Sequence, residues 1–430
     1  MPFSRRSFLQ KTAQATIVAP FLRPGSAKRL ESLFEQKALL SPEELATDED
    51  FWFQVRQAFP ASANVINLNN GGVSPHPQNV SEALETYERF SNEAPGLYMW
   101  RTLGKLRERV RRKLADLGGC EPEQVAIMRN ATEALNTVIM GADLKPGDEV
   151  LTTDQDYPNM LHTLDMRARR EGIKVNKISL PVATDDPQEL LNAFRDGMTA
   201  RTKLVLACHV VNRTGQILPV KEIGELAHEN GAEMAVDGAH SYANIPFSIP
   251  DLDCDYYGTS LHKWLCAPFG TGMLYVKPEK IRSLWPLMGY PEGEEEKITK
   301  FEHLGTRAFS HELGISHAID FHNGIGTARK HARLQYLKHY WTDKVKDIPD
   351  VKFHTNLSDE RSTAVVNLAI KNMSTPALSG NLYNRYQIYV SMTQHPDCTG
   401  LRISPQVYTS LDELDLLAVA IRDFASEARQ

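Results

Sequence analysis

The stretch "TKLVLACHVVNRTGQILPVKEIGELAHENGAEMAVDGAH", from Thr202 to His240, decides the fold. Its first ten residues form a largely apolar run that predicts a strand. The segment VKEIGELAHENG predicts a helix, and AEMAVDGAH predicts a second strand. A strand, a helix and another strand in succession are typical of a parallel sheet that helices cover on both faces.

The same alternation extends upstream of this stretch, and the pattern changes downstream of it. Strands are predicted for QVAIMRN and DEVLTTD, and helices for ATEALNTVIMGADL and YPNMLHTLDMRARREG. After Phe301 the sequence predicts one long helix over 315–345, short strands in STAVVNLAI, QIYVSMT and GLRISPQ, and a last helix in LDELDLLAVAIRDFASEA. We therefore expect an α/β protein with a large, mostly parallel sheet domain and a smaller α+β C-terminal domain.

Four segments follow from these patterns. They are a leader over 1–27, a helical segment over 28–65, a large domain over 66–310 and a small domain over 311–430.

Composition excludes several classes of protein. The 430 residues are 42% hydrophobic and 24% charged, as in an ordinary globular protein, and the formal net charge of −6 contains no basic block. Nucleic acid is therefore not an expected partner. No apolar run is long enough to predict a membrane span. The five cysteines include no Cys-x-x-Cys pair, so no metal site is predicted.

The first residues resemble a bacterial export signal. Ser4-Arg5-Arg6-Ser7-Phe8-Leu9 is similar to a twin-arginine motif, and a modest apolar stretch and small residues follow it up to Ala27. The alternative is a chance Arg-Arg pair in a terminal segment. The pattern predicts export of the folded chain to the periplasm, and a cytoplasmic location if the signal is not used.

Polar residues at the ends of the predicted strands are the candidate site, because ligands of such sheets bind at the carboxyl ends of strands. Lys263, in SLHKW, could form a Schiff base if burial lowered its pKa, although most lysines after a strand are simply exposed. Asp237 could hold a protonated pyridine nitrogen. The candidates are Asn130–Thr132, Asp156–Tyr157, Asn212, Asp237–His240 and Lys263.

An anion site is predicted beside this lysine. Ala131 and Thr132 open a helix, whose backbone N–H groups suit a phosphate, and Ser260 and His262 could complete the site. The alternative is an ordinary helix cap at Asn130 or Thr132.

SLHKW, VDGAH and RNATEAL, with EHLGTR and GLRIS downstream, resemble the class V aminotransferase family. Tyr157, His240 and WRTLG at 100–104 are similar to its isopenicillin-N-epimerase-like branch. The resemblance extends from about Leu68 to the C-terminus. It implies fold type I of the pyridoxal-phosphate-dependent transferases and pyridoxal 5′-phosphate as the cofactor.

The resemblance also implies roles for single residues. Lys263 would bind the cofactor aldehyde and Asp237 its ring nitrogen. Ala131, Thr132, Ser260 and His262 would hold the phosphate. His240 and Asn212 would lie near the phenolic oxygen, and Tyr157 would stack on the ring and take part in catalysis. Arg402 and Asn70 would bind the substrate. Thr306 would reach the phosphate of a neighbouring subunit, which implies a homodimer.

Several reactions stay open on the sequence. The predicted activity is a pyridoxal-phosphate-dependent reaction at the amino group or α-carbon of an amino-acid-type small molecule, with transamination preferred. The alternatives are epimerisation, a role similar to that of periplasmic siderophore-tailoring enzymes and, less favoured, cysteine desulfuration or another lyase reaction. A cofactor-bound binding protein without turnover is the non-enzyme alternative.

Overall fold

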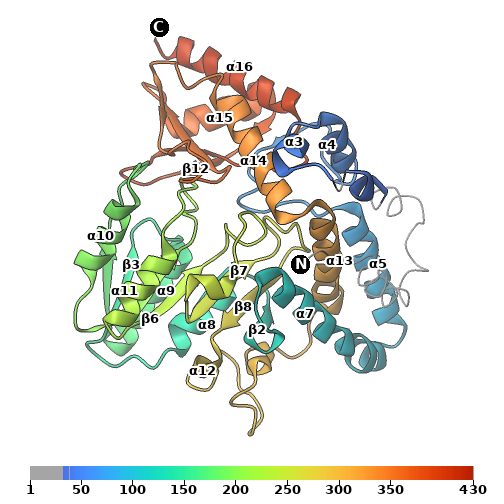
Figure 1. Cartoon of the computed structure of the whole chain (residues 1–430), viewed down its shortest axis with the longest axis vertical. Coiled ribbons are helices and arrows are strands. Elements are labelled where there is room, and N and C mark those ends of the chain that lie inside the picture. The colour runs from blue at the N-terminus through green and yellow to red at the C-terminus, as the bar shows by residue number, and fades with distance from the viewer. Residues whose placement is uncertain (1–31, 38, 430) are drawn as a thin grey trace.

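A computed structural model describes residues 32–37 and 39–429, and Figure 1 shows a large sheet with its helices and a smaller C-terminal lobe. The predicted leader over 1–27 lies outside the described residues. Within the described residues, no helix combines the length and apolar character that crossing a membrane requires.

The large sheet has seven strands in the order β2-β8-β7-β6-β5-β3-β4. They are β2 (Val125–Met128), β8 (Gly272–Val276), β7 (Tyr256–Ser260), β6 (Glu233–Asp237), β5 (Thr202–Cys208), β3 (Glu149–Thr153) and β4 (Lys174–Ile178). Strands β7, β6, β5, β3 and β4 run parallel, and β8 runs antiparallel to both of its neighbours. This arrangement confirms the predicted α/β class and its mostly parallel sheet.

Strand β5 shows why the sheet is covered on both faces. Val205 and Ala207 pack into one core cluster, and Leu204 and Leu206 pack into the other. Alternate side chains of a strand point to opposite faces, so a strand that is apolar at successive positions must be buried on both faces.

Helices on the two faces complete these cores. The first face is covered by α5 (Gln78–Glu93), α7 (Arg107–Gly118), α10 (Pro187–Gly197), α11 (Val220–Glu229) and α13 (Phe309–Ile325), and the second by α8 (Ala131–Gly141), α9 (Pro158–Glu171) and α12 (Pro278–Ile281). Short turns of helix are α6 (Pro95–Leu97), η3 (Tyr98–Thr102), η4 (Leu103–Leu106), η5 (Pro122–Gln124), η6 (Ile249–Leu252) and η7 (Ile298–Glu302).

The C-terminal lobe is built on a four-stranded antiparallel sheet with the order β12-β13-β10-β9. Its strands are β9 (Val351–Phe353), β10 (Val366–Ile370), β12 (Ser391–Thr393) and β13 (Gly400–Ile403), and its helices are α14 (Thr327–Thr342), α15 (Thr375–Tyr386) and α16 (Leu411–Glu427). A separate parallel pair joins β1 (Ile66–Asn67) to β11 (Ile388–Tyr389), so the chain's early residues lie beside its late ones.

The long helix predicted over 315–345 is two helices in the structure. Gly326, with φ of 91°, separates α13 from α14. Helix α13 packs on α5 and α7, whereas α14 packs on α16 and on α3 (Pro42–Ala46). Gly326 therefore separates a helix that packs mainly on the large domain from one that packs mainly on the C-terminal lobe.

The N-terminal helices fill a fourth core cluster. Helices α3 and α4 (Glu49–Arg56) contribute Leu45, Phe51 and Trp52, which pack in one cluster with Trp264. The predicted helical segment before residue 65 is thus part of the folded body, directly behind the candidate lysine.

Candidate active site

A cavity of about 570 Å³ opens at the carboxyl ends of β5, β6 and β7. The structure brings ten of the residues predicted from the sequence to its walls, namely Ala131, Thr132, Tyr157, Asn212, Asp237, His240, Ser260, His262, Lys263 and Arg402. They come from segments up to 271 residues apart. The parallel strands gather most of them at one sheet edge, and the C-terminal lobe brings Arg402 from β13.

The amine of Lys263 lies against His240 at the floor of the cavity. Trp264 Nε1 donates to His240 Nδ1 at 3.4 Å, and His240 Nε2 lies 3.2 Å from Lys263 Nζ. An indole N–H can only donate, so Nδ1 is the acceptor and the neutral imidazole carries its proton on Nε2. That N–H can donate to Lys263 only if Nζ has a lone pair, so the arrangement fits a neutral amine.

The surroundings favour this neutral form. Burial lowers the pKa of Lys263 to about 8, which Asp237 opposes and Arg402 reinforces. Burial also keeps the pKa of His240 well below its usual value. A lysine of this kind is a nucleophile near neutral pH.

Asp237 ends β6 beneath the cavity and is 6% exposed. Its Oδ1 accepts from the Ala239 N–H at 2.9 Å. Within the described part of the chain, Oδ2 has no hydrogen-bond donor. Burial raises the pKa of Asp237 to about 6, although the Ala239 N–H and Lys263 oppose the rise. The site therefore offers one free carboxylate oxygen to a cationic ring nitrogen.

The amino end of α8 forms another wall of the cavity. Asn130 caps the helix by accepting from the Glu133 N–H at 2.8 Å, and the Ala131 N–H donates to Ser260 Oγ at 2.9 Å. His262 donates Nδ1–H to the Thr271 carbonyl at 3.0 Å, which leaves Nε2 for a ligand. Helix, hydroxyl and imidazole together suit an anion such as phosphate.

Two glycines after Lys263 shape this wall. A Cβ on Gly272 would lie 2.5 Å from the Asn130 backbone, so β8 can reach the start of α8 only with glycine at this position. Gly270 turns the chain with φ of 74°, a conformation that side chains disfavour.

Arg402 lies on β13 and points into the cavity from the C-terminal lobe. Its Nη1 donates to the Asn212 carbonyl at 3.1 Å and its Nη2 to Asn69 Oδ1 at 2.8 Å. Its Nε and the Oδ1 of Asn212 are buried without a partner in the described residues. Burial lowers the pKa of Arg402 to about 10, which the nearby Tyr157 hydroxyl opposes.

Two predicted residues lie outside the cavity walls. Asn70 is fully buried, and its amide is used completely by Asn67, Ser404 and Tyr408. Its neighbour Asn69, which contacts Arg402, lines the cavity instead. Thr306 is exposed in the loop between η7 and α13, away from this cavity.

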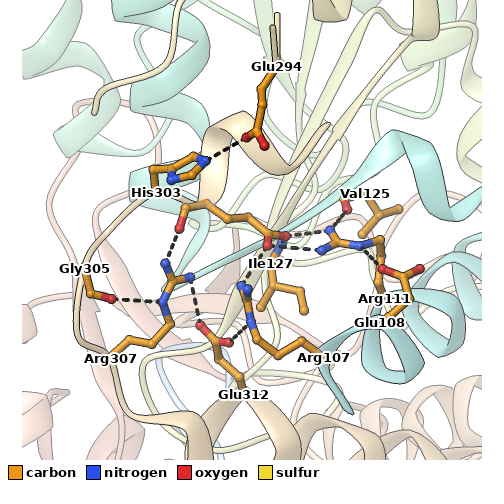
Figure 2. Close-up of polar contacts among 11 residues, drawn as sticks. Arg107, Glu108, Arg111, Val125, Ile127, Glu294, His303, Gly305, Arg307 and Glu312 are labelled. Carbon is orange, nitrogen blue, oxygen red and sulfur yellow. Dashed lines mark hydrogen bonds and ion pairs between the residues drawn. The ribbon is translucent and has the colours of Figure 1, made fainter. Parts of the chain in front are cut away.

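An ion-pair network anchors the loop that carries Thr306 (Figure 2). Glu302 is 5% exposed and binds Arg107 at 2.7 Å, Arg111 at 2.5 Å and the Ile127 N–H at 2.6 Å. Arg307 donates to the Glu302 carbonyl and pairs with Glu312. The loop is therefore fixed at its base while Thr306 is exposed.

Among the cavity residues to which the sequence gave no role are Cys208 and Arg213, whereas Asn69 was predicted only as part of an active-site segment with Asn70. Cys208 donates from both N–H and Sγ to Asp156, which is buried and accepts five hydrogen bonds in all. Asp156 thereby ties the end of β3 to the end of β5. The signal for Arg213 was its place directly after the predicted site residue Asn212.

The residues fit pyridoxal 5′-phosphate. A reactive amine, a buried carboxylate with a free oxygen and an anion wall line one cavity of suitable volume. The architecture is that of fold type I of the pyridoxal-phosphate enzymes.

Comparison with known proteins agrees with this class. The aminotransferase class-V family matches residues 66–417, so the chain belongs to this family, and its cofactor is pyridoxal 5′-phosphate. The isopenicillin N epimerase of Streptomyces clavuligerus is 30% identical over 393 residues, which are 87% of this chain and 99% of that enzyme. A probable cysteine desulfurase of Synechocystis sp. is 29% identical over 414 residues, covering 87% of this chain and 96% of that protein.

A solved structure shares the fold. The apo cysteine desulfurase of Thermococcus onnurineus NA1 has a TM-score of 0.77 and 24% identity, covering 88% of this chain and 98% of that one.

Proposed function

We propose that this family member is an amino-acid epimerase, which removes the α-proton of an amino-acid unit and returns a proton to the opposite face. The observation that carries the proposal is the placement of acid–base groups at two ends of one cavity, Lys263 after β7 and Tyr157 after β3. The order β7-β6-β5-β3 separates these strands by three spacings, about 14 Å across the sheet edge.

The cofactor supplies an electron sink for the α-carbon once the amino group is joined to it. Lys263, whose pKa burial lowers to about 8, accepts the α-proton in its deprotonated form as the C–H bond breaks. The Tyr157 hydroxyl donates a proton to the other face and forms the new C–H bond, and the reverse direction exchanges the two roles. No electron is gained or lost overall. Arg402 holds the substrate carboxylate, and Asp237 keeps the ring nitrogen charged.

The cysteines argue against desulfuration by a cysteine nucleophile. Cys398 lies outside the cavity walls, and burial raises its pKa to about 11. Cys208 lines the cavity but is bound to Asp156, and burial raises its pKa well above the usual value. A thiol in either setting is a poor acceptor of sulfur, because the thiolate is the reactive form. Similarity to the Streptomyces epimerase over nearly its whole length supports the same choice.

Transamination, which the sequence favoured, is the second candidate. Among the described residues, Lys263 is the one lysine in the cavity wall, and one base can move a proton between two carbons on the same face. This reaction needs no donor at the position of Tyr157.

The decisive experiment incubates the purified holoenzyme with L- and D-amino acids in D2O. We expect α-deuterium in the NMR spectrum and the opposite enantiomer by chiral chromatography, without a 2-oxo acid. The Tyr157→Phe variant keeps the ring and loses the hydroxyl. It should still exchange the α-proton of one enantiomer, while inversion falls about 10²–10⁴-fold. Stoichiometric 2-oxo acid, with inversion absent, would assign the enzyme to the aminotransferases.

The proposal includes a homodimer with shared sites. Thr306 is exposed on its anchored loop, and large apolar side chains are exposed at Phe269 (51%) and Trp285 (65%). If these side chains belong to one contiguous patch in the assembled protein, that patch would suit a partner surface. Sedimentation equilibrium should give twice the chain mass, and Thr306→Ala should weaken cofactor binding without changing that mass.

We also propose export by the twin-arginine route, on the motif at Arg5 and Arg6. Fusion of the first thirty or so residues to a reporter, with both arginines changed to lysine, tests this. Unchanged secretion of the variant would rule it out.

A further inference from the structure

Arg213 follows Asn212 in the loop after β5 and lines the same cavity as Arg402. Its Nε donates to the Gln155 carbonyl and its Nη1 to the Gln394 carbonyl, both at 3.3 Å. Gln155 follows β3 of the large sheet, and Gln394 follows β12 of the C-terminal lobe. Arg213 therefore reaches across the mouth of the cavity, and among the described residues no acceptor is found for Nη2.

Neither guanidinium in this cavity has a carboxylate partner. Within residues 32–37 and 39–429, neither Arg213 nor Arg402 forms an ion pair within 4.0 Å. Both donate hydrogen bonds to neutral oxygens instead, and one acceptor of Arg402 is the carbonyl of Asn212, the residue directly before Arg213. Arg213 also lies near enough to lower the pKa of Arg402. Two like charges beside one another are costly unless an anion joins them.

The nearby acidic side chains do not fill that role. Asp154 faces His395, whose Nε2 lies 3.6 Å away, and also accepts from Ser179. Asp156 is occupied by Thr152, Thr153 and Cys208. Asp237 lies at the floor, where it meets the cofactor ring. Among the described residues, Asp237 is the one acidic side chain in the cavity wall, so the wall around Arg402 and Arg213 offers them no carboxylate.

From this geometry we infer that the enzyme acts on a dicarboxylic amino acid, with Arg402 binding one carboxylate and Arg213 the other. The inference rests on the proposed function in taking an amino-acid unit as the substrate. One bidentate guanidinium satisfies one carboxylate, so a second guanidinium in the same cavity without a carboxylate partner in the described residues indicates a second acidic group in the ligand. Arg213 is therefore a specificity-determining residue.

The test measures binding without reaction, so that it does not depend on which reaction the enzyme catalyses. Glutarate has two carboxylates and butyrate has one, and neither has an amino group. Calorimetry with the holoenzyme should give at least tenfold tighter binding of glutarate than of butyrate. Arg213→Gln should weaken glutarate about 10–100-fold, as expected for loss of a charged hydrogen-bond partner, and leave butyrate unchanged. Arg402→Gln should weaken both.

Arg195→Gln, on the exposed face of α10, is the matched control and should change neither affinity. Equal affinities for the two acids, or equal losses in Arg213→Gln, would overturn the inference, because both arginines would then serve one carboxylate. The two proposals can fail separately. If the enzyme prefers glutarate through Arg213 but forms 2-oxo acids, the substrate class stands and epimerisation is wrong.

Discussion

Arginines occur in two clusters with opposite surroundings. Around Glu302, Arg107 and Arg111 each bind a carboxylate within 3.0 Å (Figure 2). In the cavity, Arg402 and Arg213 bind neutral oxygens and, within the described residues, no carboxylate. Arg402 is 9% exposed and Arg213 is half-buried, so the clearest contrast with the Glu302 network is that between Arg402 and Arg111, which are both buried. An arginine that pairs with a buried carboxylate of the protein stabilises the fold. An arginine without such a partner can bind an anionic group of a ligand. Changes in the cavity should therefore impair catalysis, and changes in the Glu302 network should impair stability.

The largest effect is expected at the cavity floor. Lys263→Ala removes the base and the covalent anchor, so turnover should fall by about 10²–10⁴-fold or more. The assay is α-proton exchange followed by NMR, and the thermal midpoint should be retained. Lys338 is fully buried and pairs with Asp359 at 2.9 Å outside the cavity. Lys338→Met should lower the midpoint and leave turnover per folded molecule intact. If Lys263→Ala lowered only the thermal midpoint and Lys338→Met abolished turnover, the contrast between cavity residues and buried ion pairs would be wrong.

Glu302→Gln should have the next largest effect, on the free energy of unfolding. It leaves Arg111 buried with a weakened partner, at a cost of about 3–5 kcal/mol measured by urea denaturation. Glu108 also pairs with Arg111, but the Glu108 side chain is 53% exposed. Glu108→Gln should therefore cost about 0–1 kcal/mol of unfolding free energy. Equal losses of unfolding free energy in Glu302→Gln and Glu108→Gln would show that burial does not determine how much these ion pairs stabilise the fold.

Acid should reduce the difference between wild type and Glu302→Gln. Burial alone would raise the pKa of Glu302, but Arg111 and Arg107 outweigh burial and hold it below the usual value. The unfolded chain then binds more protons, so this stabilisation is complete above the unfolded pKa and is lost as pH falls through the folded pKa.

A mixed effect is expected for Gly272→Ala. The new Cβ would lie 2.5 Å from the Asn130 backbone and displace the start of α8. Overpacking should cost about 1–3 kcal/mol of stability. Cofactor affinity, measured by absorbance titration of the apoenzyme, should fall about tenfold, which corresponds to about 1.4 kcal/mol. Gly289→Ala, where no atom lies within 4 Å of the new Cβ, is the control.

The smallest effect is expected for Cys398→Ala, which should leave kcat/KM unchanged because this thiol is outside the cavity. Cys208→Ala, which removes a donor to Asp156, should lower it. A large loss of activity in Cys398→Ala, together with release of sulfide from cysteine by the wild type, would return desulfuration to consideration.

The sequence predicted the sheet, and with it the floor of the cavity, because parallel strands bring their carboxyl ends to one edge. Asp237 and Lys263 could be paired from this rule alone. The choice between Asn69 and Asn70 could not, because it depends on the bridge between Asn69 and Ser404 across 335 residues of chain. Arg213 was missed because its position in the sequence does not show whether an arginine binds a ligand or is solvated. Its hydrogen-bond and ion-pair partners show this, and they are visible only in the structure.

The helix boundary at Gly326 was missed for another reason. The residues on both sides continue a helical pattern, and glycine is tolerated within helices. Only the packing of α13 and α14 on different cores requires the chain to turn there.

The indole that fixes His240 has a consequence for processing of the chain. Trp264 packs in one cluster with Leu33, Leu45 and Phe51 from the amino-terminal helices. Cleavage after Leu33 would therefore remove side chains that pack around Trp264. Trp264 in turn holds His240, which contacts the amine of Lys263. If the proposed leader is removed, the cut should therefore fall before Leu33, because the residues that follow pack behind the indole that contacts His240.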